Sequence, residues 1–102
     1  MIRHCVFVRY KAETTADQKR QIGEEIAALK SRLVGLQAVH LGNNVSPEGL
    51  DKGYGEGFMV DFDDEAALHR YLADAEHKKT GAKIVAAAEG GLEGIFVYDL
   101  KV

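Results

Sequence analysis

Hydrophobic side chains alternate with polar ones along four short stretches of the chain. Alternation with a period of two is typical of strands, because successive side chains of a strand point to opposite faces of its sheet. The first stretch is rich in Val, Ile and aromatic residues, and the third carries Phe58, Val60 and Phe62 at every second position. The pattern therefore predicts strands over residues 2–10, 36–45, 54–62 and 92–100.

Between the first two predicted strands, hydrophobic residues recur at helical spacing. Intervals of four, three and four place them on one side of an amphipathic helix. Thr15 and Gln18 precede this stripe with the spacing of a capping box, which predicts where the helix begins. The stripe consists of Ile22, Ile26, Leu29 and Leu33.

Two shorter helices are predicted between the third and fourth strands. Asp63 and Asp64 can cap the first of these, which carries Leu68, Tyr71 and Leu72 on its hydrophobic side. A break near residues 73–76 separates it from a second helix over about 76–89. The interior of that last helix contains Gly81, a residue that weakens helices.

The resulting order of elements is β-α-β-β-α-(α)-β. This order contains two crossover units and indicates an α+β fold of the ferredoxin-like type, with an antiparallel four-stranded sheet and all helices on one face. The chain has 102 residues, of which 46% are hydrophobic, and we expect it to form a single domain over residues 1–102.

The face of the sheet without helices is expected to be apolar as well. Alternation on the first strand places His4 on the helix face and Cys5 on the other, so both sides have apolar centres. An exposed apolar patch of this size predicts an interface, here a homodimer in which two sheets form a barrel. The alternative is a strand shifted by one residue, which exchanges its two faces. The expected patch consists of Cys5, Phe7, Val39, Leu41, Met59, Ile95 and Val97.

Composition and charge narrow the possible partners. The net charge of −3 provides no clustered positive field, which argues against nucleic acid. Hydrophobic runs are too short to cross a membrane, and no signal peptide is evident. Cys5 is the only cysteine, so it can form neither an internal disulfide nor a cysteine-based zinc site. The four histidines lack the spacing of metal ligands. We therefore expect a cytoplasmic protein without a metal or another cofactor.

Three side chains offer acid–base chemistry in a pocket between sheet and helices. His4 can act there as a general base or orient a substrate, although a lone buried histidine is more often structural. For Tyr71, the more common role of such a residue is that of a core aromatic whose hydroxyl reaches solvent or the backbone. His77 follows the helix break, where its side chain can turn back toward Tyr71. Ile26 and Phe58 would form apolar walls of this pocket.

Several segments resemble the stress-responsive dimeric α/β-barrel (Dabb) family over essentially the whole chain. The resemblance implies a ferredoxin-like homodimer with a central barrel. The segments are Ile2-Arg3-His4-Cys5-Val6-Phe7, Gly42-Asn43-Asn44-Val45-Ser46, Gly53-Tyr54-Gly55-Glu56-Gly57-Phe58, Phe62-Asp63-Asp64-Glu65-Ala66 and Tyr71-Leu72-Ala73-Asp74-Ala75-Glu76-His77.

One enzyme of that family is a polyketide cyclase that works by an aldol reaction with a histidine and a tyrosine. By position, His77 and Tyr71 match that pair, and His4 matches a histidine of its pocket. Glu56 occupies the place of a further pocket histidine, and the His-Pro-x-His pattern common in the family is reduced here to its last histidine. Three functions follow as hypotheses: a stress-response dimer that binds a small, partly apolar molecule, a cofactor-independent cyclase or lyase, and a structural dimer without a ligand.

Overall fold

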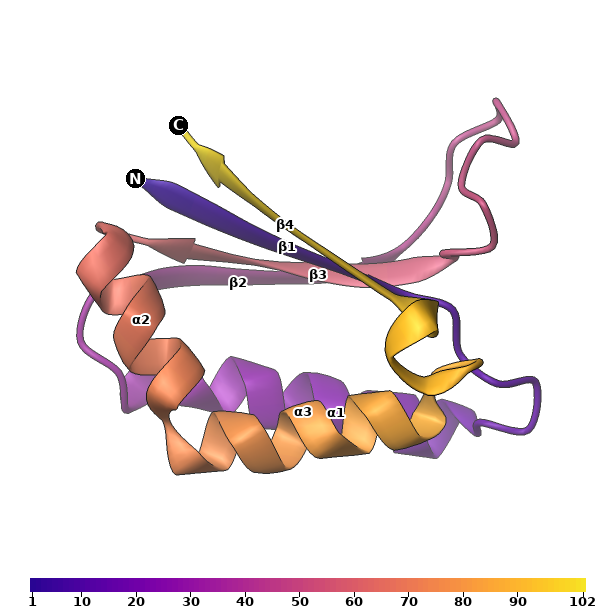
Figure 1. Cartoon of the computed structure of the whole chain (residues 1–102), viewed down its shortest axis with the longest axis horizontal. Coiled ribbons are helices and arrows are strands. Elements are labelled where there is room, and N and C mark those ends of the chain that lie inside the picture. Colours follow the sequence, from indigo (N-terminus) through magenta and orange to yellow (C-terminus); the bar gives the residue numbers. More distant parts are fainter.

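Four antiparallel strands form one sheet, and three helices cover one of its faces (Figure 1). The computed structural model describes all residues, 1–102. The strands lie in the order β2-β3-β1-β4, so the first and last strands of the chain are neighbours. The predicted ferredoxin-like architecture is thereby confirmed. Its elements are β1 (Ile2–Val8), α1 (Ala16–Ala28), β2 (Leu36–Asn43), β3 (Glu56–Phe62), α2 (Glu65–Ala73), α3 (Ala75–Ala87) and β4 (Ile95–Lys101), with short 3-10 turns at Leu29–Ser31 and Gly91–Gly94.

The helices begin where polar side chains satisfy their free backbone N–H groups. Thr15 and Gln18 form the predicted capping box at α1, and Asp64 accepts the backbone N–H of Ala67 at the start of α2. Asp74 lies between α2 and α3, where its side chain accepts the backbone N–H of His77. The chain turns sharply at this residue, which is the predicted break.

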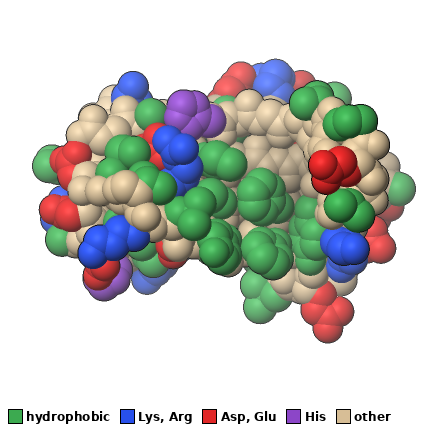
Figure 2. Space-filling view, turned by 90° about the horizontal axis from the view of Figure 1, so that it is seen from above, with side chains coloured by type: hydrophobic (Ala, Val, Ile, Leu, Met, Phe, Trp, Pro, Cys, Tyr) green, Lys and Arg blue, Asp and Glu red, His purple; other side chains and the backbone are tan.

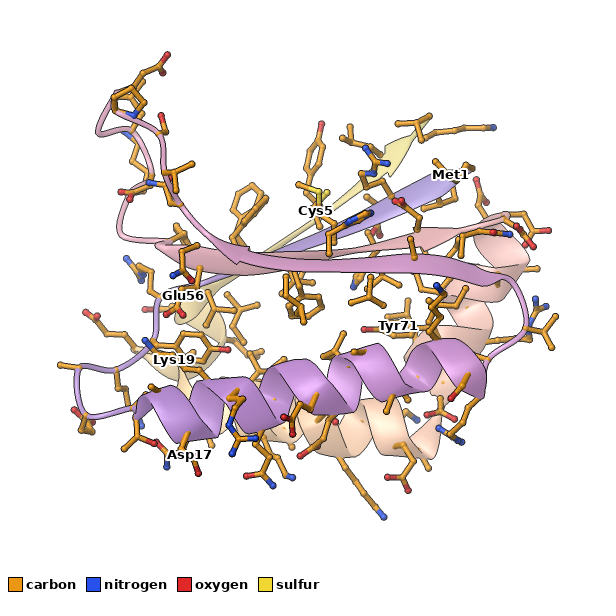
Figure 3. All side chains as sticks on the ribbon, turned by 180° about the vertical axis from the view of Figure 1, so that it is seen from behind. Met1, Cys5, Asp17, Lys19, Glu56 and Tyr71 are labelled. Carbon is orange, nitrogen blue, oxygen red and sulfur yellow. The ribbon has the colours of Figure 1, made fainter.

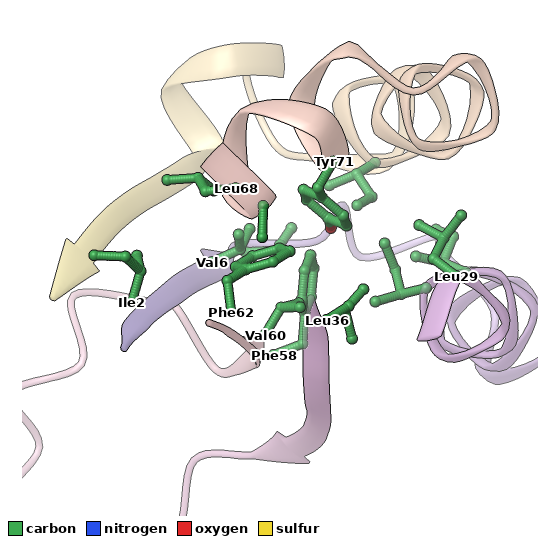
Figure 4. Packing of buried hydrophobic residues seen from close by; sticks show 14 of the residues in the cluster. Ile2, Val6, Leu29, Leu36, Phe58, Val60, Phe62, Leu68 and Tyr71 are labelled. Carbon is green, nitrogen blue, oxygen red and sulfur yellow. The ribbon is translucent and has the colours of Figure 1, made fainter. Parts of the chain in front are cut away.

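The core lies between the helices and the sheet. Ile22, Ile26 and Leu29 of the predicted stripe are buried there, and Leu33 is partly buried against them. Figure 4 shows Tyr71 packed over the side chains of the central strands. None of the helices is long and apolar enough to span a membrane.

The predicted strands extend a few residues too far at their ends. Tyr10 forms only an isolated bridge with Ala88 beyond β1, and β3 begins at Glu56 rather than at residue 54. The largest difference is at β4, because Gly91–Gly94 forms a 3-10 turn before the strand begins at Ile95.

Strand pairing corrects the prediction of which side chains occupy the face without helices, here called the open face. Residues paired across antiparallel strands share a face. Ile95 and Val97 pair with buried Val8 and Val6, so they face the helices. Placing these two side chains on the open face was wrong, because both alternating sets of β4 are apolar and alternation alone does not say which set points inward.

The same correction applies to two residues of β2. Val39 and Leu41 pair with buried Val60 and Phe58, so both face the helices. The register of β2 shifts between Leu36 and Ala38, which changes its alternation, and the sequence gives no sign of that shift. The open face instead carries Cys5, Phe7, Met59, Phe96, Tyr98 and Leu100.

Candidate functional site

Five of the six predicted site residues lie in two separate places, and the sixth, Ile26, packs in the core. His4 of β1, Tyr71 of α2 and His77 of α3 come together in the core, and we call them the His–Tyr–His cluster. The ring centroids of His4 and Tyr71 are 5.6 Å apart, and those of Tyr71 and His77 are 4.0 Å apart. Phe62 supports the cluster, with its ring centroid 5.1 Å from that of Tyr71.

Local structure explains why Tyr71 and His77 meet. Tyr71 lies in the last turn of α2 and His77 in the first turn of α3, on either side of the corner at Asp74. The backbone N–H of Asp74 donates to the carbonyl of Tyr71 at 3.1 Å, while its side chain accepts the backbone N–H of His77 at 3.0 Å. Asp74 therefore fixes the angle at which the two rings face each other.

Two polar atoms of the cluster are buried without a hydrogen-bond partner. They are the hydroxyl of Tyr71 and Nδ1 of His77. In Figure 3 the hydroxyl of Tyr71 points along the space between the sheet and the helices. Buried polar atoms without a partner are rare, because each one loses its hydrogen bonds to water on folding. Such atoms mark a place where a water molecule or a ligand can bind.

Burial also changes the titration of these two groups. It raises the pKa of the Tyr71 hydroxyl far above its usual range, so this group stays protonated at neutral pH. It lowers the pKa of His77, and the neighbouring His4 lowers it further, against a smaller opposite effect of Asp74. His77 is therefore a neutral imidazole at pH 7, and Tyr71 is a neutral hydroxyl donor.

Asp99 is a member of this site that the sequence analysis did not identify. Its Oδ1 lies 2.5 Å from Nδ1 of His4, which is directly opposite on the neighbouring strand. Because an ionised carboxylate only accepts hydrogen bonds, Nδ1 of His4 is the donor in this contact. Only the register of β1 and β4 reveals the pair, and the two residues are 95 positions apart.

Glu56 and Phe58 lie in the second place, at the other end of the helix-covered side. They line a cavity of about 450 Å³ between α1 and the sheet, together with Tyr10 and Lys19. Lys19 Nζ lies 2.7 Å from Glu56 Oε2 and 5.2 Å from the centroid of the Tyr10 ring. Figure 3 shows Lys19 and Glu56 side by side where α1 approaches the sheet.

The predicted pocket with all six residues around it does not form as one space. Ile26 is 1% exposed and packs in the core, and none of the residues of the His–Tyr–His cluster lines the cavity beside α1. Packed side chains therefore separate the cluster from the cavity. No group of three or more His, Cys, Asp or Glu side chains is arranged to hold a metal ion.

Fold and site together define a ferredoxin-like α+β protein with the His–Tyr–His cluster between its sheet and its helices. The chain belongs to the stress responsive A/B barrel domain (Dabb) family, whose sequence model matches residues 2–102. This confirms the family to which the sequence segments pointed.

Three comparisons illustrate its relatives. The stress-response A/B barrel domain-containing protein HS1 of Arabidopsis thaliana is 24% identical over 100 residues, which cover 98% of this chain and 88% of HS1. A dimeric ferredoxin-like protein of unknown function from Jannaschia sp. CCS1 is 31% identical and superimposes with a TM-score of 0.93, covering 99% and 98% of the two chains. Hydroxynitrile lyase from Passiflora edulis is 20% identical, with a TM-score of 0.86 and coverage of 99% and 92%, and it shows the shared fold alone.

Proposed function

We propose that this protein is a homodimer of the stress-response type, formed through its open face. The support is the apolar surface there: Phe96, Tyr98 and Leu100 are 49%, 52% and 40% exposed. Figure 2, which looks onto this face, shows hydrophobic side chains gathered at its centre. Exposed apolar patches of this kind mark interaction sites. The relative from Jannaschia, described as dimeric, supports the same assembly.

Sedimentation at micromolar concentration tests this assembly. The wild-type chain is expected to sediment as a dimer and Phe96→Asp as a monomer, because a charge in the interface has no partner. Leu92→Asp is the matched control, since Leu92 is 74% exposed and lies outside the sheet, in the 3-10 turn before β4. A monomeric wild type, or equal effects of both substitutions, contradicts the proposal.

We further infer that the dimer binds a small, partly apolar molecule between the sheet and the helices. The observation that carries this function is the cavity beside α1, which combines the rings of Tyr10 and Phe58 with the Lys19–Glu56 ion pair. Its volume of about 450 Å³ suits a small molecule, since ligand pockets usually measure about 300–1,000 Å³.

The single cysteine, Cys5, is a free buried thiol, and we propose a reducing, cytoplasmic location.

Filling the cavity tests this function. A Cβ atom added at Gly23 would lie 3.4 Å from Leu41, so Gly23→Leu places its side chain into the space beside α1. With 4-ethylphenol as the probe, we expect saturable NMR shifts at Gly23 and Ala27 in the wild type and none in the variant. Gly81→Leu, on an open part of α3, is the matched control and should bind as the wild type does. Equal binding by all three proteins contradicts the proposal.

A second candidate function is cofactor-independent acid–base catalysis of the cyclase or lyase type. The observation that favours it is the pair of unpartnered atoms, Tyr71 hydroxyl and His77 Nδ1. A neutral imidazole can remove a proton alpha to a carbonyl, and the resulting enolate can attack a second carbonyl carbon. The hydroxyl of Tyr71 can donate a hydrogen bond to the alkoxide that forms, and His4, oriented by Asp99, can bind the substrate.

Proton exchange separates this candidate from a structural dimer. We expect the protein to accelerate exchange of the alpha protons of 1-phenylpropan-2-one in D2O, measured by NMR. His77→Gln removes the base and should abolish the acceleration, whereas His69→Gln changes an exposed histidine of α2 and should retain it. If neither exchange nor binding of 4-ethylphenol is observed, the remaining function is that of a structural dimer without a ligand.

A further inference from the structure

The connection between β2 and β3, residues 44–55, leaves the sheet on the side of the open face. Figures 1 and 3 both show it rising from the end of the sheet, in the direction away from the helices. We call this segment the arm. Hairpin connections usually need only about 2–5 residues, and longer ones often have a function of their own. The arm is therefore longer than the joining of two strands requires.

Hydrogen bonds within the arm hold its shape. At its base, the backbone N–H of Asn44 donates to the carbonyl of Gly55 at 2.8 Å, and the side chain of Asn44 donates to Asp51 at 2.9 Å. The hydroxyl of Tyr54 donates to the carbonyl of Glu93 at 3.2 Å, which ties the arm to the turn before β4. A segment that is already ordered loses little conformational entropy when it binds a partner.

Two apolar side chains of the arm are exposed to solvent. Val45 is 92% exposed and Leu50 is 64% exposed. Single exposed hydrophobic residues are common on protein surfaces. These two differ because they lie on a segment that projects beyond an apolar sheet face. A second copy of the chain that covers the open face therefore meets the arm as well.

A hollow of about 850 Å³ separates the arm from the open face. Figure 2 shows it between the hydrophobic centre of this face and the arm. The rings of Phe7, Tyr54 and Phe96 line it, and the centroid of Phe96 is 6.3 Å from that of Phe7 and 6.0 Å from that of Tyr54. The apolar surface of the open face thus continues into the hollow, where side chains of a second copy can pack.

Charged groups of both signs surround this apolar lining. Arg9, Asp51 and Lys52 line the hollow, and none of them forms an ion pair within the chain. The buried Nε–H of Arg9 has no acceptor. An apolar centre with a polar rim is the usual composition of an interface between two proteins. The mixed charge therefore fits a protein surface with both signs, such as that of a second copy.

From these observations we propose that the arm packs against the partner subunit of the homodimer. Val45 and Leu50 are then buried in the contact, and side chains of the partner fill the hollow between the arm and the sheet. This inference rests on the proposed homodimer, and it adds a second contact surface to the sheet residues Phe96, Tyr98 and Leu100.

NMR spectra of mixed dimers test the proposal directly. In dimers of one ¹³C-labelled and one unlabelled chain, isotope-filtered NOEs arise only between subunits. We expect such NOEs from the methyl groups of Val45 and Leu50, and none from Val34, which is exposed in the connection before β2. NOEs from Leu100 of the sheet without any from Val45 and Leu50 would overturn the arm contact and leave the dimer intact. A wild-type chain that sediments as a monomer would overturn both.

Two double variants measure what the arm contributes to the affinity. Val45→Ala with Leu50→Ala should raise the Kd of the dimer by about tenfold or more in fluorescence-detected sedimentation, because each dimer has two arms. Val34→Ala with Leu92→Ala changes the same residue types at exposed positions outside the sheet, and its Kd should stay within about twofold of the wild type.

Equal effects of the two double variants would overturn the arm contact. An unchanged Kd in the arm variant would overturn it as well, and a monomeric Phe96→Asp beside that result would show that the sheet alone forms the dimer. Because both double variants shorten only exposed side chains, both are expected to fold as the wild type does.

Discussion

The buried hydroxyl of Tyr71 leads to the prediction that Tyr71→Phe makes the protein more stable. Tyr71 is fully buried, and its hydroxyl has no hydrogen-bond partner. A buried donor without a partner costs about 1–3 kcal/mol, because its hydrogen bonds to water are lost without replacement. Removing one oxygen atom leaves only a small void and loses few contacts. We therefore expect the free energy of unfolding to rise by about 1–2 kcal/mol.

Thermal unfolding measured by circular dichroism at one fixed protein concentration provides the assay. One kcal/mol corresponds to about 4–8 °C for a domain of this size, so the Tm of Tyr71→Phe should rise by about 5–10 °C. A fixed concentration is needed because dimerisation adds to the apparent stability. Urea unfolding should rank the variants in the same order of stability.

Tyr54→Phe is the matched control for this measurement. The hydroxyl of Tyr54 donates to the carbonyl of Glu93 at 3.2 Å near the surface, so its removal should lower stability slightly, by about 0.5 kcal/mol. The two Tyr→Phe substitutions are expected to change the free energy of unfolding in opposite directions, because only one of the two hydroxyls is buried without a partner. A loss of 1 kcal/mol or more in Tyr71→Phe would refute the reasoning, because it would mean that a water molecule or His77 satisfies the hydroxyl.

Three further predictions concern the same core and the helix beside it. Burial lowers the pKa of His77, so the unfolded chain binds more protons than the folded one. Stability should therefore fall as the pH drops from about 7 to 5, and His77→Gln should flatten that slope in unfolding curves. Asp99→Ala leaves Nδ1 of His4 without its acceptor and should cost about 1–3 kcal/mol in urea unfolding, whereas Asp99→Asn retains an acceptor oxygen and should cost less. Gly81→Ala lies in an open part of α3 and should add about 1 kcal/mol in thermal unfolding.

Each of these predictions has an outcome that contradicts it. An unchanged pH slope in His77→Gln would show that the imidazole is hydrated in the folded protein. Equal stability of Asp99→Ala and the wild type would show that water replaces the carboxylate at His4. A loss of stability in Gly81→Ala would show that α3 packs against a neighbour at that point, in contrast to the open space beside it.

Local patterns in the sequence predict most of the fold. The capping box at Thr15, the cap at Asp64 and the hydrophobic stripe of α1 depend on residues a few positions apart, and the structure confirms all three. The contact between Tyr71 and His77 is local in the same way. It follows from the helix break, which the polar residues before His77 already indicate.

Features that depend on strand register are the ones that sequence reasoning misses. Both alternating sets of β4 are apolar, so the sequence does not decide whether Phe96 or Val97 faces the helices. The shift of register in β2 is likewise invisible before its partner strand is known. The role of Asp99 was missed for the same reason, because only pairing between β1 and β4 brings this carboxylate to His4. Pairing of distant strands is a tertiary property, whereas helix caps are local.

The corner at Asp74 also bears on the order in which the site assembles during folding. Tyr71 and His77 are joined by a few residues of chain, so their contact needs almost no loop closure, whereas the contact between His4 and Asp99 closes nearly the whole chain. The helical corner can form in a partly folded chain, before the sheet is complete. The hydrogen bond between His4 and Asp99 can form only after β1 and β4 have paired. The contact between Tyr71 and His77 therefore depends on a local corner, whereas the contact between His4 and Asp99 belongs to the complete sheet alone.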